Sequence, residues 1–505
     1  MEEAHFWEEL VRSALIGTDR HRMDAGIRTH LQNKLPELPE DPAHELLTAA
    51  STYSLLHRAT VRAKPFEGKL AEAIPERTTG NPALSKLVQR LLREPYRLAL
   101  PEFVQVCHRR GYELPPESVP ALLDQALKDP VLQQHLPDLT GMLGIWLCNQ
   151  NPDWSVLQWD ADISDWASLS VEVRYGLLQR IRRQAPDQAR DFLGQVWSVL
   201  SHLEKQRLLS VFQISLSKSD EAFLERVLED GRQEVRKVAA GLLLQLDGSS
   251  RMELIWEELQ ALLQVKGKVL RLKLPEEAHD FFQTYRLIDS ALVKSLSLRE
   301  SWLYFRVAAM PIFRWNVLGR PARLIDLADR NPDGESLLRA WWSASLRDQN
   351  PEWADAWLEW LIARKKMPEW LYKEELRLFA ERLSPKKMNE TLAGVIRKQE
   401  GLIADGSVLH QLLIVSPHIW GEELSWLFLS RFQEYVEEVG SFFWDSWHYR
   451  DLLQRAAFQI WPPLAHELTA QWANGEVNWG MWEKEVGYLL DILVFRQEFW
   501  RALES

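Results

Sequence analysis

One short stretch near the middle of the chain constrains the fold more than any other feature. It opens with an aspartate and a Val-Arg pair and continues with alanines and leucines: Asp230, Gly231, Arg232, Gln233, Glu234, Val235 and Arg236, then Ala239, Ala240, Leu243 and Leu246. The apolar members recur at the spacing of one helical face, and this order is typical of the second helix of a helical repeat. A unit of this kind cannot bury its apolar face alone, so the stretch predicts similar helix pairs on both sides.

Helical patterns also fill the sequence around this repeat. Between residues 170 and 246 the apolar residues form five short helical faces with brief turns between them. We therefore predict an all-α fold, an α-solenoid of stacked antiparallel helix pairs of the HEAT or armadillo type. One exception is expected near residues 265–275, where basic and apolar residues alternate and indicate a short extended or hairpin segment. That segment either contacts an acidic partner or links two halves of the solenoid.

Composition divides the predicted solenoid into four regions. They are an N-terminal helical region at 1–148, HEAT-like repeats at 149–264, tryptophan-rich helical repeats at 265–400 and an acidic, tryptophan-rich cap at 401–505. Of the 24 tryptophans, seventeen follow residue 300. Trp353, Trp357 and Trp360 share one helical face, which predicts that most tryptophans fill seams between stacked helices. The alternative is an exposed aromatic groove that holds a partner.

Composition and motifs also argue against several classes of function. A net charge of −12 disfavours nucleic-acid binding by the whole chain, and the two cysteines, Cys107 and Cys148, form neither a disulfide framework nor a metal-binding spacing. His466 and Glu467 begin like a zinc-protease helix, but Ala470 stands where the second ligand would be. Because the N-terminus is acidic and the sequence has no long apolar run, we expect no signal peptide and no membrane span. We expect a cytoplasmic protein without metal or cofactor.

A series of short motifs, taken in order, carries a family resemblance. It runs from Ala14-Leu-Ile-Gly-Thr-Asp-Arg20 through Leu143-Gly-x-Trp146-Leu, Asn151-Pro-Asp-Trp154 and Ser219-Asp-Glu-Ala-Phe-Leu224 to the tryptophans near residue 353. In this series the chain resembles a bacterial family of helical-repeat proteins without an established activity. Members of that family are encoded beside MoxR-type AAA+ ATPases, VWA-domain proteins and SWIM zinc-finger proteins. The resemblance implies an adaptor in a chaperone-like assembly.

Architecture and resemblance together favour a non-catalytic scaffold that binds other proteins. The partner that the resemblance implies is an AAA+ ATPase or a VWA-domain protein. The candidate partner-binding residues are Gly17, Thr18, Asp19 and Arg20, which follow the first predicted helix. A helix cap with a local ion pair between Asp19 and Arg20 is the alternative explanation of these four residues.

A second hypothesis is a nucleic-acid-binding protein or a glycosylase-like enzyme built on helical repeats. Residues 51–110 hold eleven basic residues against five acids, and Arg90, Arg93 and Arg97 lie close to helical spacing. Such a row can follow phosphates, and exposed tryptophans can stack on bases. The alternative is a solvated helix face that complements acids elsewhere in the solenoid. We identify no catalytic carboxylate in this setting.

Overall fold

The computed structural model confirms the all-α prediction. It describes residues 3–32, 39–60, 82–157, 162–287, 293–399, 403–439, 448–473 and 477–503. In these ranges the chain is mainly helical, and one two-stranded hairpin is the only sheet. The chain divides into two compact units, residues 1–73 and 74–505.

The first unit is a small group of three helices. They are α1 (Glu3–Ile16), α2 (Ala25–Gln32) and α3 (Pro42–Thr60). Among its described residues, the buried core consists of Phe6, Leu10, Ile27, Leu31 and Ala49, with Met23, Leu46, Ala50 and Tyr53 packed against it. The ring of Phe6 stacks on Tyr53 with centroids 5.5 Å apart, which joins α1 to α3. α1 ends at Gly17, whose φ of +91° suits glycine because it lacks a β-carbon.

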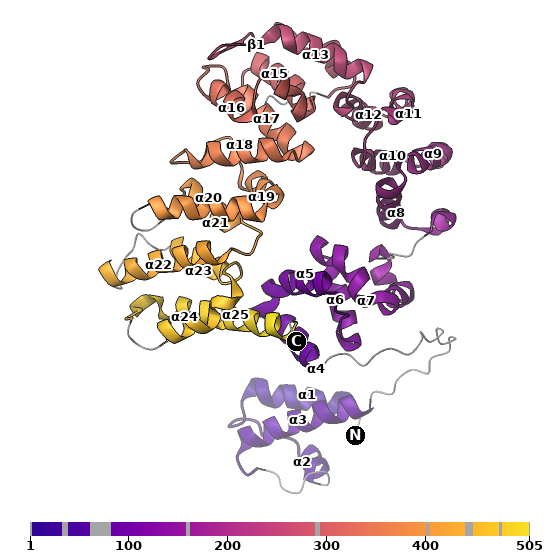
Figure 1. The fold of residues 1–505 in the computed structure, drawn as a ribbon. Helices are drawn as coiled ribbons and strands as arrows, with labels where there is room; N and C mark the ends of the chain where they lie inside the picture. The colour runs from indigo at the N-terminus through magenta and orange to yellow at the C-terminus, as the bar shows by residue number, and fades with distance from the viewer. Residues whose placement is uncertain are drawn as a thin grey trace. The chain divides into compact units, whose positions relative to one another are not determined.

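The second unit is a stack of helix pairs arranged in two rows. Each helix of the first row packs on the next: α8 (Val171–Gln184), α10 (His202–Ser210), α12 (Gln233–Gln245), α15 (Leu298–Ala309), α17 (Glu335–Asp348), α19 (Lys373–Arg382), α21 (Val408–Val415), α23 (His448–Ala456) and α25 (Glu483–Ala502). The second row holds α9 (Pro186–Val196), α11 (Glu221–Val227), α13 (Ser250–Leu262), α16 (Pro321–Asp329), α18 (Pro351–Ile362), α20 (Pro385–Lys398), α22 (Glu422–Val439) and α24 (Ala465–Trp472). Consecutive helices of the two rows form the stacked pairs that the sequence predicts (Figure 1).

A few elements lie outside these rows. The unit begins with α4 (Pro82–Leu91), α5 (Leu100–Arg110), α6 (Val119–Ala126) and α7 (Pro130–Gln150). Between α13 and α15 lie the hairpin strands β1 (Leu263–Lys266) and β2 (Val269–Leu272) and the short helix α14 (Asp280–Thr284). The hairpin falls at the segment where the alternating sequence predicts extended backbone.

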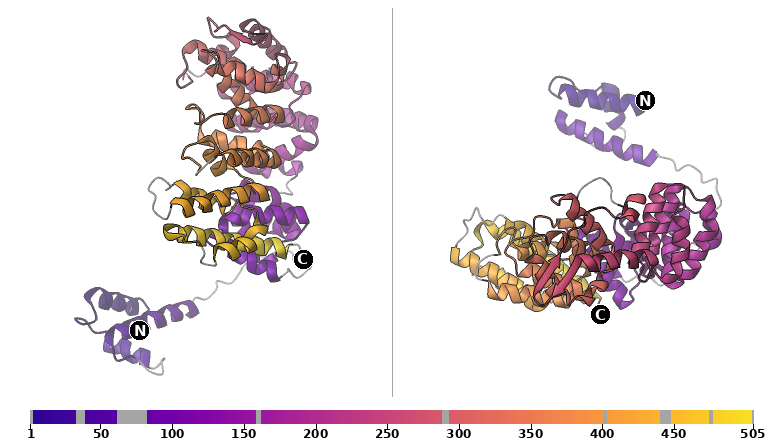
Figure 2. Two further views of the ribbon diagram at one scale, coloured as in Figure 1. Left: turned by 60° about the vertical axis from the view of Figure 1, so that its left-hand side comes forward. Right: turned by 90° about the horizontal axis from the view of Figure 1, so that it is seen from above.

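The stack of the second unit returns to its own beginning. α25 packs against α4, and its Phe495, Phe499 and Leu503 share one apolar core with α4 to α7. Phe499 meets Phe103 of α5 edge to face, with ring centroids 5.6 Å apart. Figures 1 and 2 show the last helices lying beside the first helices of this unit. The solenoid of residues 74–505 is therefore closed rather than open-ended.

Tryptophans fill the seams of the stack, as their spacing predicts. The side chains of Trp315, Trp341, Trp342, Trp353 and Trp357 are fully buried. The ring centroids of Trp341 lie 5.6 Å from those of both Trp315 and Trp353, so that successive helix pairs are linked through aromatic contacts. Large rigid rings at these seams exclude water over a wide area for little loss of side-chain entropy.

Donor side chains from one helix pair cap the C-terminal carbonyls of the preceding pair. Arg347 donates hydrogen bonds to the carbonyls of Ala308 and Met310 at the end of α15. His418 donates to the carbonyls of Ala380 and Leu383 at the end of α19, 3.1 Å from each. The carbonyl of Ala380 also accepts the N–H of Leu383 at 3.3 Å, so His418 adds a second donor there. The contacts thus supply donors to carbonyls at the helix ends and fix neighbouring pairs together.

Candidate binding surfaces

The four predicted partner-binding residues form the turn that ends α1. The carbonyl of Gly17 accepts hydrogen bonds from the N–H groups of Arg20 and His21, each 3.0 Å long. Asp19 and Arg20 are exposed, and in the described part of the chain no ion pair joins them. The helix cap is thus formed without the local ion pair, and both charged side chains remain open to solvent.

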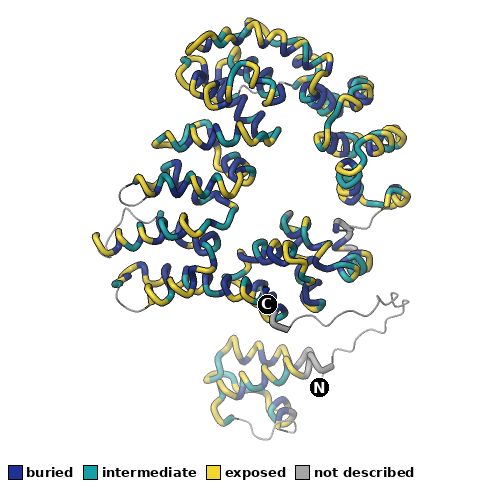
Figure 3. Tube along the Cα trace, in the orientation of Figure 1, coloured by how far each residue is buried: buried dark blue, intermediate teal, exposed yellow. Residues whose placement is uncertain are grey.

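An exposed apolar stripe runs along α1 toward this turn. Trp7, Val11 and Leu15 follow one another at four-residue spacing and are 50%, 36% and 82% exposed, and Ile16 beside them is 47% exposed. α3 adds the exposed Leu47 and Leu55. Among the described residues of this unit, six large apolar side chains are exposed and five apolar residues form the core. Figure 3 colours much of α1 and α3 as exposed. Clustered exposed apolar side chains are more common at interaction surfaces than on the rest of a protein surface.

A pocket of about 550 Å³ lies in the second unit, at the corner where three helices of neighbouring pairs meet. The end of α16, the start of α17, the end of α18 and residues 368–372 surround it. Its aromatic wall consists of Trp360, Trp370 and Tyr372, and its charged residues are Lys294, Asp329, Glu335, Arg339, Arg364 and Glu369.

The charges of this pocket are largely paired with one another. The guanidinium of Arg364 lies 4.0 Å from the ring centroid of Trp360 and forms an ion pair with Asp329. Arg339 forms an ion pair of 3.2 Å with Glu335 and donates a hydrogen bond of 2.8 Å to the carbonyl of Lys294. With three cations against three acids, the pocket offers no strong net charge to an ion. Its aromatic wall suits an apolar or aromatic side chain.

Two of the three arginines that the sequence predicts as a phosphate-binding row, Arg90 and Arg97, form ion pairs within the chain. Arg90 forms an ion pair of 2.5 Å with Glu498, and its guanidinium lies 4.3 Å from the ring centroid of Phe495. Arg97 pairs with Glu94 at 2.6 Å. Arg90 thus belongs to the contact between α4 and α25, which matches the alternative that these cations complement acids elsewhere in the solenoid.

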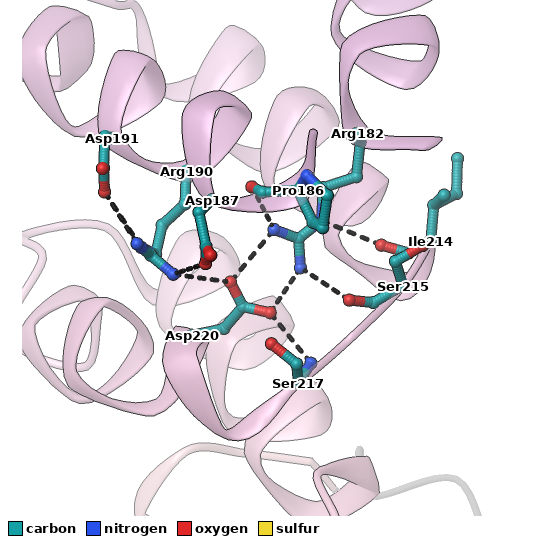
Figure 4. A network of polar contacts seen from close by, with 9 residues as sticks. All are labelled: Arg182, Pro186, Asp187, Arg190, Asp191, Ile214, Ser215, Ser217 and Asp220. Atoms are coloured by element: carbon teal, nitrogen blue, oxygen red, sulfur yellow. Dashed lines mark hydrogen bonds and ion pairs between the residues drawn. The ribbon is translucent and has the colours of Figure 1, made fainter. Parts of the chain in front are cut away.

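A fully buried ion pair joins Arg182 of α8 to Asp220, just before α11 (Figure 4). Both side chains are fully buried. Arg182 also donates to the carbonyls of Pro186, Ile214 and Ser215, and Asp220 accepts the N–H of Ser217 at 3.0 Å. Every guanidinium nitrogen of Arg182 thus has a partner, so the pair holds two helix pairs together and leaves no group directed at a ligand.

Groups suited to metal binding or a membrane span are missing from the ranges that the structure describes. No three His, Cys, Asp or Glu side chains converge there as metal ligands. Within the same ranges no helix is both long enough and apolar enough to cross a bilayer. Cys107 and Cys148 are both buried, and burial raises the pKa of Cys107 to about 12.

The fold is that of an all-α protein with a closed stack of helix pairs and a small additional helical unit. Residues 9–503 match the model of DUF5691, a family of unknown function, and the chain belongs to that family. Comparisons with curated proteins and with solved structures find no match to it.

Proposed function

We propose that the protein is a non-catalytic cytoplasmic scaffold that binds other proteins, and that the stripe Trp7, Val11 and Leu15 on α1 is a principal contact. The observation that carries this proposal is the excess of exposed over buried large apolar side chains among the described residues of the first unit. Burial of one such side chain stabilises an interface by about 1.5–3 kcal/mol, so three in a row supply a substantial apolar centre.

The stripe has the form of a helix that docks into a groove. Residues four apart on one helix form an apolar edge about two turns long. Hydrophobic grooves of partner proteins bind helices through apolar side chains at this spacing. The exposed Asp19 and Arg20 lie just beyond its end and would supply part of a polar rim, as interfaces require. The candidate turn Gly17 to Arg20 and the stripe therefore act as one surface in this proposal.

The partner that we propose is an AAA+ ATPase or a VWA-domain protein. Support comes from the ordered motifs of the sequence and from the closed stack, because long stacks of helix pairs offer extended surfaces for other proteins. The aromatic pocket at α16 to α18 provides a further place for a partner side chain.

A pull-down from the cell that makes the protein tests this function. The tagged full chain is captured from nuclease-treated lysate, and co-purifying proteins are identified by mass spectrometry. Recovery of an AAA+ ATPase or a VWA-domain protein at a fixed ratio to the bait supports the scaffold. If proteins are captured from untreated lysate but not from nuclease-treated lysate, the ligand is nucleic acid, and this result would contradict the proposal.

A further inference from the structure

The hairpin formed by β1 and β2 stands at the edge of the stack beside α13 (Figure 1). Its strands pair in antiparallel register, with Gln264 opposite Arg271 and Lys266 opposite Val269. A two-residue turn joins them, and Gly267 in that turn has a φ of +58°, which glycine adopts without strain. The guanidinium of Arg323 on α16 donates to the carbonyl of Gly267 and holds the turn against the stack.

The hydrogen-bond pattern leaves one main-chain edge of this hairpin open. The N–H of Lys273 donates to the carbonyl of Leu262 at 2.9 Å, so residues of β1 with even numbers face β2 in the ladder. The N–H and carbonyl of Val265 consequently point away from β2, and no described group bonds to them. On the other edge, Asn331 donates to the carbonyl of Leu270 at 2.9 Å. β2 also packs against α16, so the β1 edge is the more accessible one for another strand.

The two faces of the hairpin differ sharply in chemistry. Leu263 and Leu270 are buried against the stack, 1% and 5% exposed. The opposite face and the turn carry four exposed cations that take part in no ion pair among the described residues: Lys266, Lys268, Arg271 and Lys273. They form a local positive field on a chain whose net charge is −12.

We propose that the β1 edge binds an acidic, extended polypeptide segment of a partner protein by strand addition. The main chain of Val265 supplies one donor and one acceptor to the added strand, and the carbonyl of Leu263 supplies a second acceptor. An added strand lies about 4.8 Å from β1, where its outward side chains come beside Lys266 and within reach of Arg271.

Charge selects among the strands that could add. Lysine on an open edge repels basic strands and disfavours neutral, apolar ones, because pairing would bury or crowd the ammonium group. An acidic strand converts the same residues into cross-strand ion pairs. Nucleic acid is disfavoured because it cannot use the open main chain of Val265 and because the chain as a whole is acidic.

This site lies in the second unit, and its chemistry differs from that of the apolar stripe on α1. It does not depend on the proposed function of that stripe. Strand addition is therefore tested with purified full-length protein and a synthetic peptide, whereas the function of the stripe is tested with cell lysate.

The probe is a fluorescein-labelled eight-residue peptide of alternating glutamate and valine, followed by fluorescence anisotropy at low salt. The control probes are the same peptide with alternate amides N-methylated, a lysine-valine peptide and single-stranded DNA of equal charge. We expect saturable binding of the glutamate-valine peptide alone. Reversal of two charges in Lys266→Glu/Arg271→Glu should weaken this binding roughly tenfold or more, since each reversal removes an attraction and adds a repulsion.

A matched variant separates the site from general charge effects. Lys386→Glu/Lys398→Glu reverses two exposed cations on α20, which changes the net charge by as much as the hairpin variant does, and should leave peptide binding unchanged. Equal binding of the N-methylated peptide, equal binding of DNA, or equal losses in the hairpin and α20 variants would overturn strand addition. Circular dichroism of each variant establishes that the helical fold is intact.

Discussion

Arg496 on α25 donates hydrogen bonds of 2.6 and 3.1 Å to the two carboxylate oxygens of Glu102 on α5, which lies 394 residues earlier in the chain. Arg496 is fully buried and also donates to the carbonyls of Ala457 and Ile460. Glu102 accepts a further hydrogen bond of 2.8 Å from the indole of Trp500. This pair therefore joins the end of the second unit to its beginning and caps a helix of the preceding pair at the same time.

Removal of this contact should open the closed stack. In Arg496→Ala, Glu102 and two carbonyls lose a buried cationic partner, a change that costs about 3–5 kcal/mol. Hydrogen exchange should show faster exchange in α25 and α4, with α10 and α12 unchanged. Arg501→Ala, which removes an exposed arginine from the same helix, is the control and should exchange like wild type. Unchanged protection of α25 in Arg496→Ala would contradict the closure.

Single changes in the pair Arg182–Asp220 should lower the stability of the fold by about as much as the loss of Arg496. Asp220→Asn keeps the shape but leaves the buried guanidinium without its counter-charge, so we expect a loss of about 3–5 kcal/mol in the free energy of unfolding. Urea unfolding followed by circular dichroism measures it. Asp187→Asn alters an exposed partner of Arg190 and should change stability by less than about 1 kcal/mol. Equal stabilities of the two variants would show that the buried pair contributes little.

His418 should make the fold sensitive to mild acid. Burial lowers the pKa of His418 below its ordinary value of 6.5, so the folded state holds the ring neutral. The unfolded chain binds the proton more readily, and stability is therefore full above about pH 6.5 and declines as the pH falls toward the lower folded pKa. Urea midpoints between pH 7.5 and 5 measure the decline.

Two variants isolate the contribution of His418. His418→Gln retains an N–H donor for the carbonyls of Ala380 and Leu383 without a proton that titrates, so its stability should vary less with pH than that of wild type. His466→Gln changes an exposed histidine and should leave the pH dependence as it is. If His418→Gln keeps the full pH dependence, another group is responsible.

Local features of the fold could be predicted because their signals are local. The spacing of Trp353 and Trp357 indicates one buried helical face, Gly17 marks the end of α1, and the alternation near residue 265 marks the hairpin. Each signal spans a few residues and depends on helix or strand geometry alone.

Contacts between distant segments left no such signal. Nothing near Glu102 in the sequence indicates Arg496, so the closure of the stack could not be predicted. The pocket draws Lys294, Arg339 and Trp370 from three separate segments, and only the structure brings them together. Exposure of the α1 stripe was also hidden, because a periodic apolar face is normally buried.

The scaffold hypothesis is tested most directly by measuring how much partner protein a variant of the α1 stripe captures. Val11→Glu/Leu15→Glu places two charges on exposed positions and should leave folding within about 0.5 kcal/mol of wild type. The control is Leu203→Glu, at a leucine of α10 that is 66% exposed in the other unit.

Wild type and Leu203→Glu should recover the same proteins in equal amounts. Val11→Glu/Leu15→Glu should lose at least 90% of the AAA+ ATPase or VWA-domain protein, or of whatever protein wild type captures at a fixed ratio. The reason is that burial of two charges in the interface costs well over about 1.4 kcal/mol, which corresponds to a tenfold loss of affinity. Undiminished capture by the stripe variant would contradict the account.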